Sequence, residues 1–194
     1  MTSPATGARC FGDGDPLYER YHDEEWGRPV TDERGLFERL ALEGFQSGLS
    51  WLTILRKREA FRAAFAGFDP DAVAAFGAAD VERLLGDARI VRNRAKIEAT
   101  IVNARATVDL HDDGATLHEL IWERHRPPPR TTPPKTWAEV PSQTPETVAL
   151  AKDLKRRGFR FVGSTICYAF MQAVGMVNDH VIECFRHGEL AGRC

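Results

Sequence analysis

The segment Asp80–Ala106, with the sequence DVERLLGDARIVRNRAKIEATIVNARA, decides the fold. We expect a short helix that ends near Leu85 and a longer helix from about Arg92 to Leu110. The stretch Gly86–Val91 between them breaks the helical pattern and forms a hairpin. The segment therefore predicts two helices joined by a tight turn.

Helical patterns also dominate the rest of the chain. Asp32, Ser50 and Asp69 stand immediately before apolar-periodic runs, where N-cap residues are expected. The stretch 126–145 holds seven of the eleven prolines and predicts a loop. No segment alternates with a strand period, so we expect an all-α protein. The further helices are expected at residues 32–44, 50–65, 69–76, 117–124, 144–157, 164–174 and 178–187.

Composition places the chain among globular proteins. Of its 194 residues 43% are hydrophobic and 28% are charged, which argues against disorder and against a disulfide scaffold. The net charge of -2 means that any surface for a polyanion must be local. No apolar run approaches the ~18 residues of a membrane span. No basic segment followed by an apolar stretch begins the chain, and we therefore expect a cytoplasmic protein without a membrane partner.

Cysteines and histidines near the two ends of the chain suggest a metal site. His180 and Cys184 are four residues apart in the last expected helix, where their side chains would share one face. Cys10 and His22 supply a matching pair, and two thiols with two imidazoles suit tetrahedral zinc. Chance spacing is the alternative, because ligands usually lie close together in sequence. Four protein ligands would leave no position for water, so this zinc would be structural and would not support hydrolysis.

Two local clusters of basic residues are candidate phosphate-binding surfaces. Backbone N–H groups at a helix N-terminus, supported by Arg or Lys, bind phosphate without reading base identity. A solvated charged face is the alternative, and charge alone favours it. The first cluster consists of Arg89, Arg92, Arg94 and Lys96, and the second of Lys152, Lys155, Arg156, Arg157 and Arg160.

Two further segments are rich in aromatic and acidic side chains. Residues 17–27, LYERYHDEEWG, contain three aromatic residues and four carboxylates. Residues 42–51, LEGFQSGLSW, place Glu43, two glycines and Trp51 around Leu49. A loop of this composition can insert a side chain into a base stack. Taken singly, however, each aromatic residue is more often part of a core, and Glu43 more often a surface acid.

In combination, these motifs resemble the 3-methyladenine DNA glycosylase type I family, a group of constitutive bacterial enzymes in the helix-hairpin-helix superfamily. The resemblance runs in order over nearly the whole chain. The matching motifs are Cys10, Tyr18-x-x-Tyr21-His22-Asp23-x-Glu25-Trp26-Gly27, Leu42-Glu43-Gly44-x-Gln46-x-Gly48-Leu49-Ser50-Trp51, Ile90-x-Arg92-Asn93-Arg94-x-Lys96-Ile97, Lys155-x-Arg157-Gly158-Phe159-x-Phe161-Val162-Gly163 and Asn178-Asp179-His180.

The resemblance implies a helix-hairpin-helix glycosylase fold with a zinc-binding unit built from both chain ends. It implies a terminal unit over 1–31 and 165–194 around a helical domain over 32–164, or one continuous domain over 10–187. It also implies a monomer that binds double-stranded DNA. The implied sites are Glu43 as the catalytic residue; Tyr18, Tyr21, Trp51 and Phe11 as substrate-binding residues; Gly48, Leu49, Arg92, Arg94 and Lys96 as DNA-binding residues; and Cys10, His22, His180 and Cys184 as zinc ligands.

This sequence departs from the family pattern at two positions. The family commonly has a tryptophan two residues after its first cysteine, whereas Phe11 and Gly12 follow Cys10 here. We expect Phe11 to stack in its place. The hairpin carries Arg89 where the family usually carries glycine, which affects how closely that turn can approach a phosphate.

The chemistry of such an enzyme is simple to state. Methylation at N3 makes adenine cationic and a good leaving group, so the enzyme has to extrude the nucleotide, hold the base and stabilise an oxocarbenium-like sugar. Aromatic faces attract a cationic ring, and Glu43 could accept its hydrogen bonds. No lysine nucleophile stands in the pocket segments, so we expect base-excision repair by a monofunctional glycosylase. The alternative is a zinc-stabilised module that binds damaged DNA without chemistry.

Overall fold

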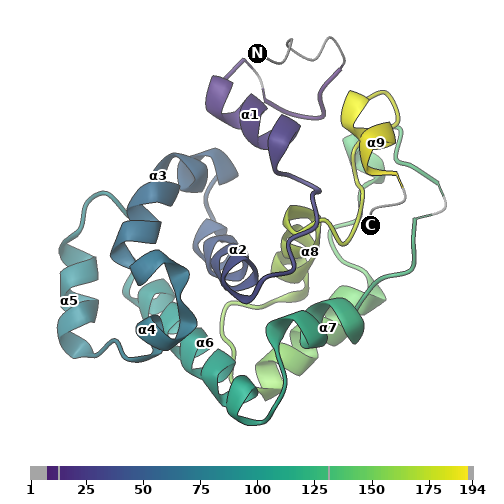
Figure 1. Ribbon diagram of the computed structural model, residues 1–194. Coiled ribbons are helices and arrows are strands. Elements are labelled where there is room, and N and C mark those ends of the chain that lie inside the picture. Colours follow the sequence, from purple (N-terminus) through teal and green to yellow (C-terminus); the bar gives the residue numbers. More distant parts are fainter. Residues whose placement is uncertain (1–7, 13, 131, 192–194) are drawn as a thin grey trace.

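The computed structural model describes residues 8–12, 14–130 and 132–191 of the protein, and its regular elements in these ranges are helices (Figure 1). This confirms the prediction of an all-α fold. Within the same ranges, no helix is long and apolar enough to cross a membrane. The α-helices are α1 Pro16–Glu24, α2 Glu33–Gln46, α3 Trp51–Ala64, α4 Pro70–Ala74, α5 Ala78–Gly86, α6 Arg94–Asp112, α7 Pro145–Arg156, α8 Ser164–Ala173 and α9 Phe185–Leu190. Two short 3-10 helices, η1 Ala66–Phe68 and η3 Trp137–Glu139, and a short π-helix, η2 Glu119–Glu123, complete the described elements.

Helix α2 forms the centre of the molecule, and α3, α6 and α8 pack around it (Figure 1). Its side chains from Leu36 to Phe45 are buried almost without interruption. Phe45 packs against Phe61 of α3 with ring centroids 4.6 Å apart. The C-terminal half of α2 therefore runs through the core, and any polar side chain there is taken out of water.

The helices begin where the sequence supplies side-chain caps. Asp32 accepts a hydrogen bond from the backbone N–H of Gly35, and Ser50 accepts one from Thr53. Asn93 accepts one from Lys96 and so sets the start of α6, two residues later than the sequence pattern suggested. Each cap satisfies one of the backbone donors that a helix leaves free at its N-terminus.

The turn between α5 and α6 has the predicted helix, turn and helix arrangement. The carboxylate of Asp87 accepts hydrogen bonds from the backbone N–H of Arg89 at 2.9 Å and from its guanidinium at 2.9 Å. Ile90 is 2% exposed and anchors the turn to the core. The turn is therefore fixed by its own residues.

The chain ends differ from the sequence prediction. The prediction of a helix from residue 178 is wrong, because α9 begins only at Phe185. The segment before it is irregular and contains a turn closed by a backbone hydrogen bond from Cys184 to Val181. Ile182 donates a backbone hydrogen bond to Pro134, and Cys184 pairs with Ala8 in an isolated parallel bridge. Tertiary contacts thus replace the expected helical hydrogen bonds. Helix α1, which the sequence analysis treated only as an aromatic and acidic segment, is capped by Asp15.

A glycine allows the end of α8 to pack against the segment that follows α1. Gly175 has a φ of 74°, and a Cβ atom there would lie 2.4 Å from the carbonyl carbon of Arg28 and 2.6 Å from the nitrogen of Pro29. Such contacts with backbone atoms cannot be relieved by a side-chain rotation.

We therefore expect Gly175→Ala to lower the free energy of unfolding by roughly 2–3 kcal/mol, the sum of backbone strain and overpacking. Denaturant unfolding measures the loss. Gly158→Ala is the matched control, because Gly158 has a φ of 89° with no atom within 4 Å of the added Cβ. Gly158→Ala should lower the free energy of unfolding only by the cost of backbone strain. Equal decreases in the two variants would contradict the packing argument.

Candidate functional site

A buried carboxylate stands at the C-terminal end of α2. Glu43 is 5% exposed. Burial raises the pKa of its carboxyl group to about 8, and the guanidinium of Arg39 acts in the opposite direction. Burial, and then the nearby charge of Glu43, also raise the pKa of the Tyr21 hydroxyl on α1. A carboxyl group that titrates near neutral pH beside a buried tyrosine is typical of a functional site.

Aromatic rings from α1, α3 and the segment before α1 form one group that includes Tyr21, on whose hydroxyl the charge of Glu43 acts. The ring centroids of Tyr21 and Trp51 are 5.3 Å apart. Phe11 lies 4.7 Å from Tyr18 and 6.3 Å from Tyr21. The structure thus brings together the four aromatic residues that the sequence predicted to bind substrate. The indole N–H of Trp51 is buried and has no hydrogen-bond partner in the described part of the chain, so it remains available for a ligand.

Trp137 extends the aromatic group and was missed by the sequence analysis. It is 42% exposed, and its ring centroid lies 6.2 Å from Phe11 and 5.8 Å from Trp26. Its indole N–H donates a hydrogen bond of 2.8 Å to the carbonyl of Cys10. One signal in the sequence could have indicated this residue: Trp137 is a large apolar side chain within the proline-rich stretch, and a solvated loop seldom contains one.

The loop between α2 and α3 presents an exposed apolar side chain. Leu49 is 41% exposed, directly after Gly48 with a φ of 79°. The ammonium group of Lys96 donates hydrogen bonds to the carbonyls of Phe45 at 2.9 Å and of Ser47 at 2.5 Å. Lys96 is 8% exposed and holds this loop from inside the protein. The structure therefore separates Lys96 from the surface arginines with which the sequence grouped it.

The arginines of the α5–α6 turn remain at the surface. Arg94 pairs with Glu82 at 2.8 Å and Arg89 pairs with Asp87 at 2.9 Å. Arg92 is exposed and forms no ion pair within the described ranges. Part of the positive charge of this cluster is therefore already neutralised, and Arg92 carries the charge that is free to meet an anion.

The predicted metal ligands form one cluster, although they come from opposite ends of the chain. The ligand atoms of Cys10, His22, His180 and Cys184 all lie within 4.8 Å of one another. The Sγ atom of Cys184 lies 3.3 Å from Nε2 of His22 and 3.4 Å from Nδ1 of His180. Ligands of a tetrahedral zinc ion, bound at 2.0–2.3 Å, are themselves about 3.3–3.8 Å apart. The cluster could therefore hold a metal ion, and its donor set fits zinc.

The second nitrogen of each imidazole is held by the surrounding protein. His22 contacts the carboxylate of Asp23 through Nδ1 at 2.8 Å, and Asp23 is fixed in turn by Arg9 at 2.8 Å. His180 contacts the carbonyl of Trp26 through Nε2 at 3.4 Å. Such contacts orient the ring and select the tautomer in metal sites. Both imidazoles thus present their other nitrogen to the cluster, where Nε2 of His22 also accepts a hydrogen bond of 3.2 Å from the backbone N–H of Cys10.

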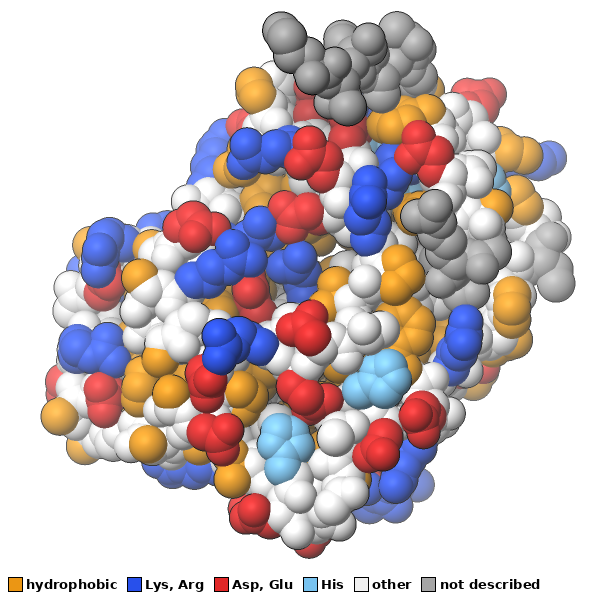
Figure 2. Space-filling view, in the orientation of Figure 1, with side chains coloured by type: hydrophobic (Ala, Val, Ile, Leu, Met, Phe, Trp, Pro, Cys, Tyr) orange, Lys and Arg blue, Asp and Glu red, His pale blue; other side chains and the backbone are white. Residues whose placement is uncertain are grey.

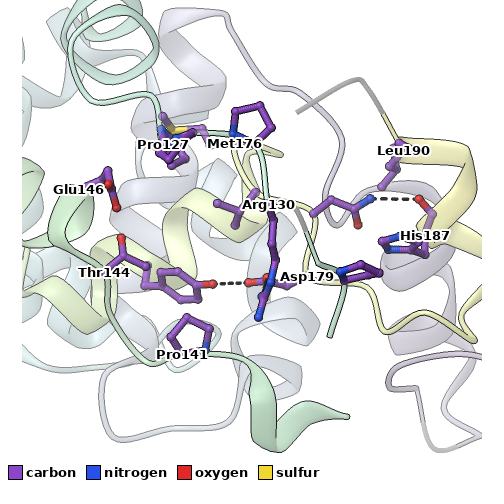
Figure 3. Close-up of a pocket in the computed structure, with 16 residues that line it drawn as sticks. Pro127, Arg130, Pro141, Thr144, Glu146, Met176, Asp179, His187 and Leu190 are labelled. Carbon is purple, nitrogen blue, oxygen red and sulfur yellow. Dashed lines mark hydrogen bonds and ion pairs between the residues drawn. The ribbon is translucent and has the colours of Figure 1, made fainter. Parts of the chain in front are cut away.

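A cavity of about 900 Å³ lies apart from Glu43, between the proline-rich stretch and α9. Figure 3 shows Arg130 and Asp179 lying toward each other at this cavity. The buried carboxylate of Asp179 accepts hydrogen bonds from Arg130 at 2.5 Å and from the hydroxyl of Tyr168 at 2.5 Å. These bonds fix the residue before His180, so we assign this network a supporting role for the metal cluster.

Residues 11–187 match the family model for methyladenine glycosylase, and the chain belongs to this family. The protein is therefore a DNA glycosylase, which is a hydrolase. This confirms the resemblance seen in the sequence.

Curated relatives of the chain carry the same activity in their names. The chain is 53% identical over 170 residues to DNA-3-methyladenine glycosylase 1 of Escherichia coli (strain K12), covering 88% of this chain and 91% of the relative. It is 44% identical over 170 residues to a DNA-3-methyladenine glycosylase of Haemophilus influenzae, covering 87% of this chain and 91% of the relative.

Solved structures of the same class superimpose closely. A crystal structure of 3-methyladenine DNA glycosylase I matches with a TM-score of 0.88 and 51% identity, over 92% of this chain and 98% of that chain. The structure of 3-methyladenine DNA glycosylase I from Staphylococcus aureus, solved to explain 3-methyladenine recognition, matches with a TM-score of 0.85 and 35% identity, over 91% of this chain and 94% of that chain. These matches place the chain among enzymes of DNA repair.

Proposed function

We propose that the protein excises 3-methyladenine from alkylated double-stranded DNA. The nucleotide is flipped out of the duplex, the base enters the pocket beside Glu43, and water cleaves the N-glycosyl bond. The observation that carries the proposal is the buried carboxyl group of Glu43, whose charge acts on the Tyr21 hydroxyl, together with the Trp51 ring 5.3 Å from the ring of Tyr21. Two structures of 3-methyladenine DNA glycosylase I that are 35% identical to this chain concern the same base: one is a complex with 3-methyladenine, and the other addresses how 3-methyladenine is recognised.

The pocket suits a base that carries a positive charge. A methyl group on N3 makes adenine cationic while it is attached to the sugar, and the faces of Phe11, Tyr18, Tyr21 and Trp51 attract such a ring. The charge also favours ionisation of Glu43, whose carboxylate then accepts hydrogen bonds from the base. Neutral adenine offers no such charge, so the pocket selects the damaged base by a difference in electrostatic energy.

We further propose that the reaction ends with an abasic site in an intact strand. A lyase step requires a free amine that attacks the sugar through a Schiff base. Lys96 comes from α6 to the loop beside the pocket, but its ammonium group is bound by the carbonyls of Phe45 and Ser47. The chemistry is therefore monofunctional.

The metal in this proposal is a structural zinc ion bound by Cys10, His22, His180 and Cys184. When bound, zinc supplies a crosslink between the two chain ends and no catalytic chemistry, because four protein ligands leave no open position. The terminal unit over 1–31 and 165–194, and the helical domain over 32–164, remain predictions; residues 1–7, 13 and 192–194 of the terminal unit lie outside the described residues.

DNA contact in this proposal uses the surface around the exposed loop. Leu49 fills the gap that the flipped nucleotide leaves in the stack, as apolar wedges do in other proteins that distort DNA. Arg92 and Arg94, with the N-terminal N–H groups of α6, contact phosphates. Lys96 contributes indirectly by fixing the loop that carries Leu49.

We expect Leu49→Ala to lower kcat/KM for excision from duplex DNA about tenfold or more, because unstacking a base costs a few kcal/mol and the wedge offsets part of this cost. Binding of free 3-methyladenine, followed by the intrinsic tryptophan fluorescence of the protein, should stay unchanged because no base has to be unstacked. Leu17→Ala serves as a control on a partly buried leucine outside this loop. If Leu49→Ala weakened both activities equally, a wedge role for Leu49 would be excluded.

The direct test of the function is chromatography of bases released from methylated duplex DNA, combined with gel analysis of the strands. We expect 3-methyladenine in the soluble fraction and strands that break only after alkaline treatment. Tight DNA binding without base release, by folded protein loaded with zinc, would instead establish a non-catalytic damage-binding module. Strand cleavage during the reaction itself would contradict the monofunctional step.

A further inference from the structure

Arg39 lies one helical turn before Glu43 on α2. The four-residue separation places both side chains on the same face of the helix. The side chain of Arg39 is 11% exposed, and its Nε atom is buried without a hydrogen-bond partner in the described ranges. A guanidinium with an unused donor thus stands near a carboxylate that is itself deeply buried.

The two acidic side chains that contact Arg39 are also paired with other arginines, so they do not fully neutralise its charge. Arg39 contacts Glu25 at 3.0 Å and Glu38 at 3.5 Å. Glu25 also accepts two hydrogen bonds from Arg58, at 2.6 and 2.9 Å, and Glu38 is bound by Arg62 at 2.8 Å. Figure 2 shows Lys and Arg side chains interleaved with Asp and Glu side chains on the face over α2 and α3.

Counting these partly buried groups gives three guanidinium cations and two carboxylates. Glu59 also pairs with Arg62, but its side chain is 81% exposed and its charge is screened by water. The cluster of Arg39, Arg58, Arg62, Glu25 and Glu38, here called the arginine cluster, therefore carries an excess of one positive charge. The ionised form of Glu43 is the anion that compensates this excess.

We propose that Arg39 is a positioning residue whose charge favours the ionised form of the buried Glu43 carboxyl group, so that a cationic base that binds beside it meets a carboxylate. The inference rests on the proposed function, because only a cationic base requires that state. Arg39 acts through Glu43, and its own contacts are to the acids of the arginine cluster.

Other titratable groups around α2 lie on α1, α6 and α8. Burial raises the pKa of the Tyr21 hydroxyl on α1 and lowers that of Lys96 on α6. On α8, burial raises the pKa of Cys167 to about 12, and burial with the Asp179 hydrogen bond raises that of Tyr168. His111 of α6 contacts Glu33, at the opposite end of α2 from Glu43. No titratable side chain occurs in η1. A pH dependence near pH 8 is therefore assigned to Glu43.

The test is the pH profile of kcat/KM for 3-methyladenine release from methylated duplex DNA, measured from pH 5 to 10. We expect the rate of the wild type to rise through an acid limb that reports Glu43. In Arg39→Gln the limb should move to higher pH by about one unit or more, because an attracting cation is lost. At pH 7 this shift corresponds to a rate roughly tenfold lower.

Three matched variants separate charge from structure. Arg39→Lys retains the cation and should keep the wild-type limb. Arg62→Gln removes one cation of the same cluster but leaves Arg39, the cation that acts directly on Glu43, so it should move the limb less than Arg39→Gln does. Glu25→Gln removes an anion near Arg39, so the limb should move to lower pH.

Two results would overturn the role of Arg39: an acid limb in Arg39→Gln that coincides with that of the wild type, or an equal upward shift in Arg39→Lys. Should Arg39→Gln fail to fold, an unmoved limb in Glu25→Gln overturns it. Failure of the proposed function is distinguishable, because the wild type would then release no base at any pH.

Discussion

Replacing Glu43 by glutamine should reduce the release of 3-methyladenine by about a hundredfold or more, the range seen when a charged catalytic group is neutralised. The amide has nearly the same shape as the carboxyl group, so the pocket and its aromatic rings stay in place. The substitution removes the attraction between the Glu43 carboxylate and the cationic base in the transition state. The measurement is single-turnover excision from methylated duplex DNA.

The same substitution should make the protein more stable above neutral pH. Burial raises the pKa of Glu43 in the folded state to about 8, whereas an unfolded glutamate titrates near about 4.3. Between these values the folded state binds more protons than the unfolded state, so Glu43 lowers the free energy of unfolding as the pH rises. Glu43→Gln removes this cost, and chemical unfolding at pH 8.5 should show a gain that disappears near pH 4.

Glu33→Gln is the control for this prediction. Glu33 lies at the start of the same helix and binds His111 and the backbone N–H groups of Leu117 and His118. Its loss should lower stability and leave excision intact, the opposite of the result expected for Glu43→Gln. Full activity in Glu43→Gln would remove this residue from the mechanism.

Replacing Cys184 by alanine should have the largest effect on stability. We expect it to abolish stoichiometric zinc binding and to lower the free energy of unfolding by roughly 5 kcal/mol or more, since structural zinc contributes directly to folding. For a chain of this length the loss corresponds to a Tm decrease of about 10–20 °C. Metal analysis of the purified protein and thermal unfolding, with and without a chelator, measure both effects.

Cys167→Ala provides the comparison, because Cys167 is also fully buried but lies outside the cluster. This variant should keep its zinc and lose only the packing of one sulfur atom, on the order of 1 kcal/mol. Identical metal content and Tm in the two variants would contradict a zinc site at Cys184.

Local chemistry made much of this fold predictable from the sequence. Asp32, Ser50 and Asn93 cap helices through their own side chains, and such contacts span only three residues. The role of Lys96 could not be predicted in this way, because its two acceptors lie about fifty residues earlier in the chain, at Phe45 and Ser47. A surface lysine and a buried lysine look alike until the fold is known.

The four residues of the candidate metal cluster were predicted to lie together, and the structure brings them together by a different local fold. The sequence analysis placed His180 and Cys184 on one face of a helix, whereas the structure has them in an irregular segment with a turn before Phe185. Their convergence depends on a hydrogen bond to Pro134 and on the bridge to Ala8. Residue chemistry identified the members of the cluster, and long-range contacts, which the sequence does not display, determined their geometry.

The joining of the two chain ends also orders the events of biosynthesis. Cys10 and His22 emerge from the ribosome early, but His180 and Cys184 emerge only after nearly all of the helices have been made. A contact between positions so far apart closes late, after the entropy of a long loop has been lost. With zinc bound as proposed, the nascent chain carries Cys10 and His22 without their partners for most of translation, and the site can be completed only after Cys184 has been made.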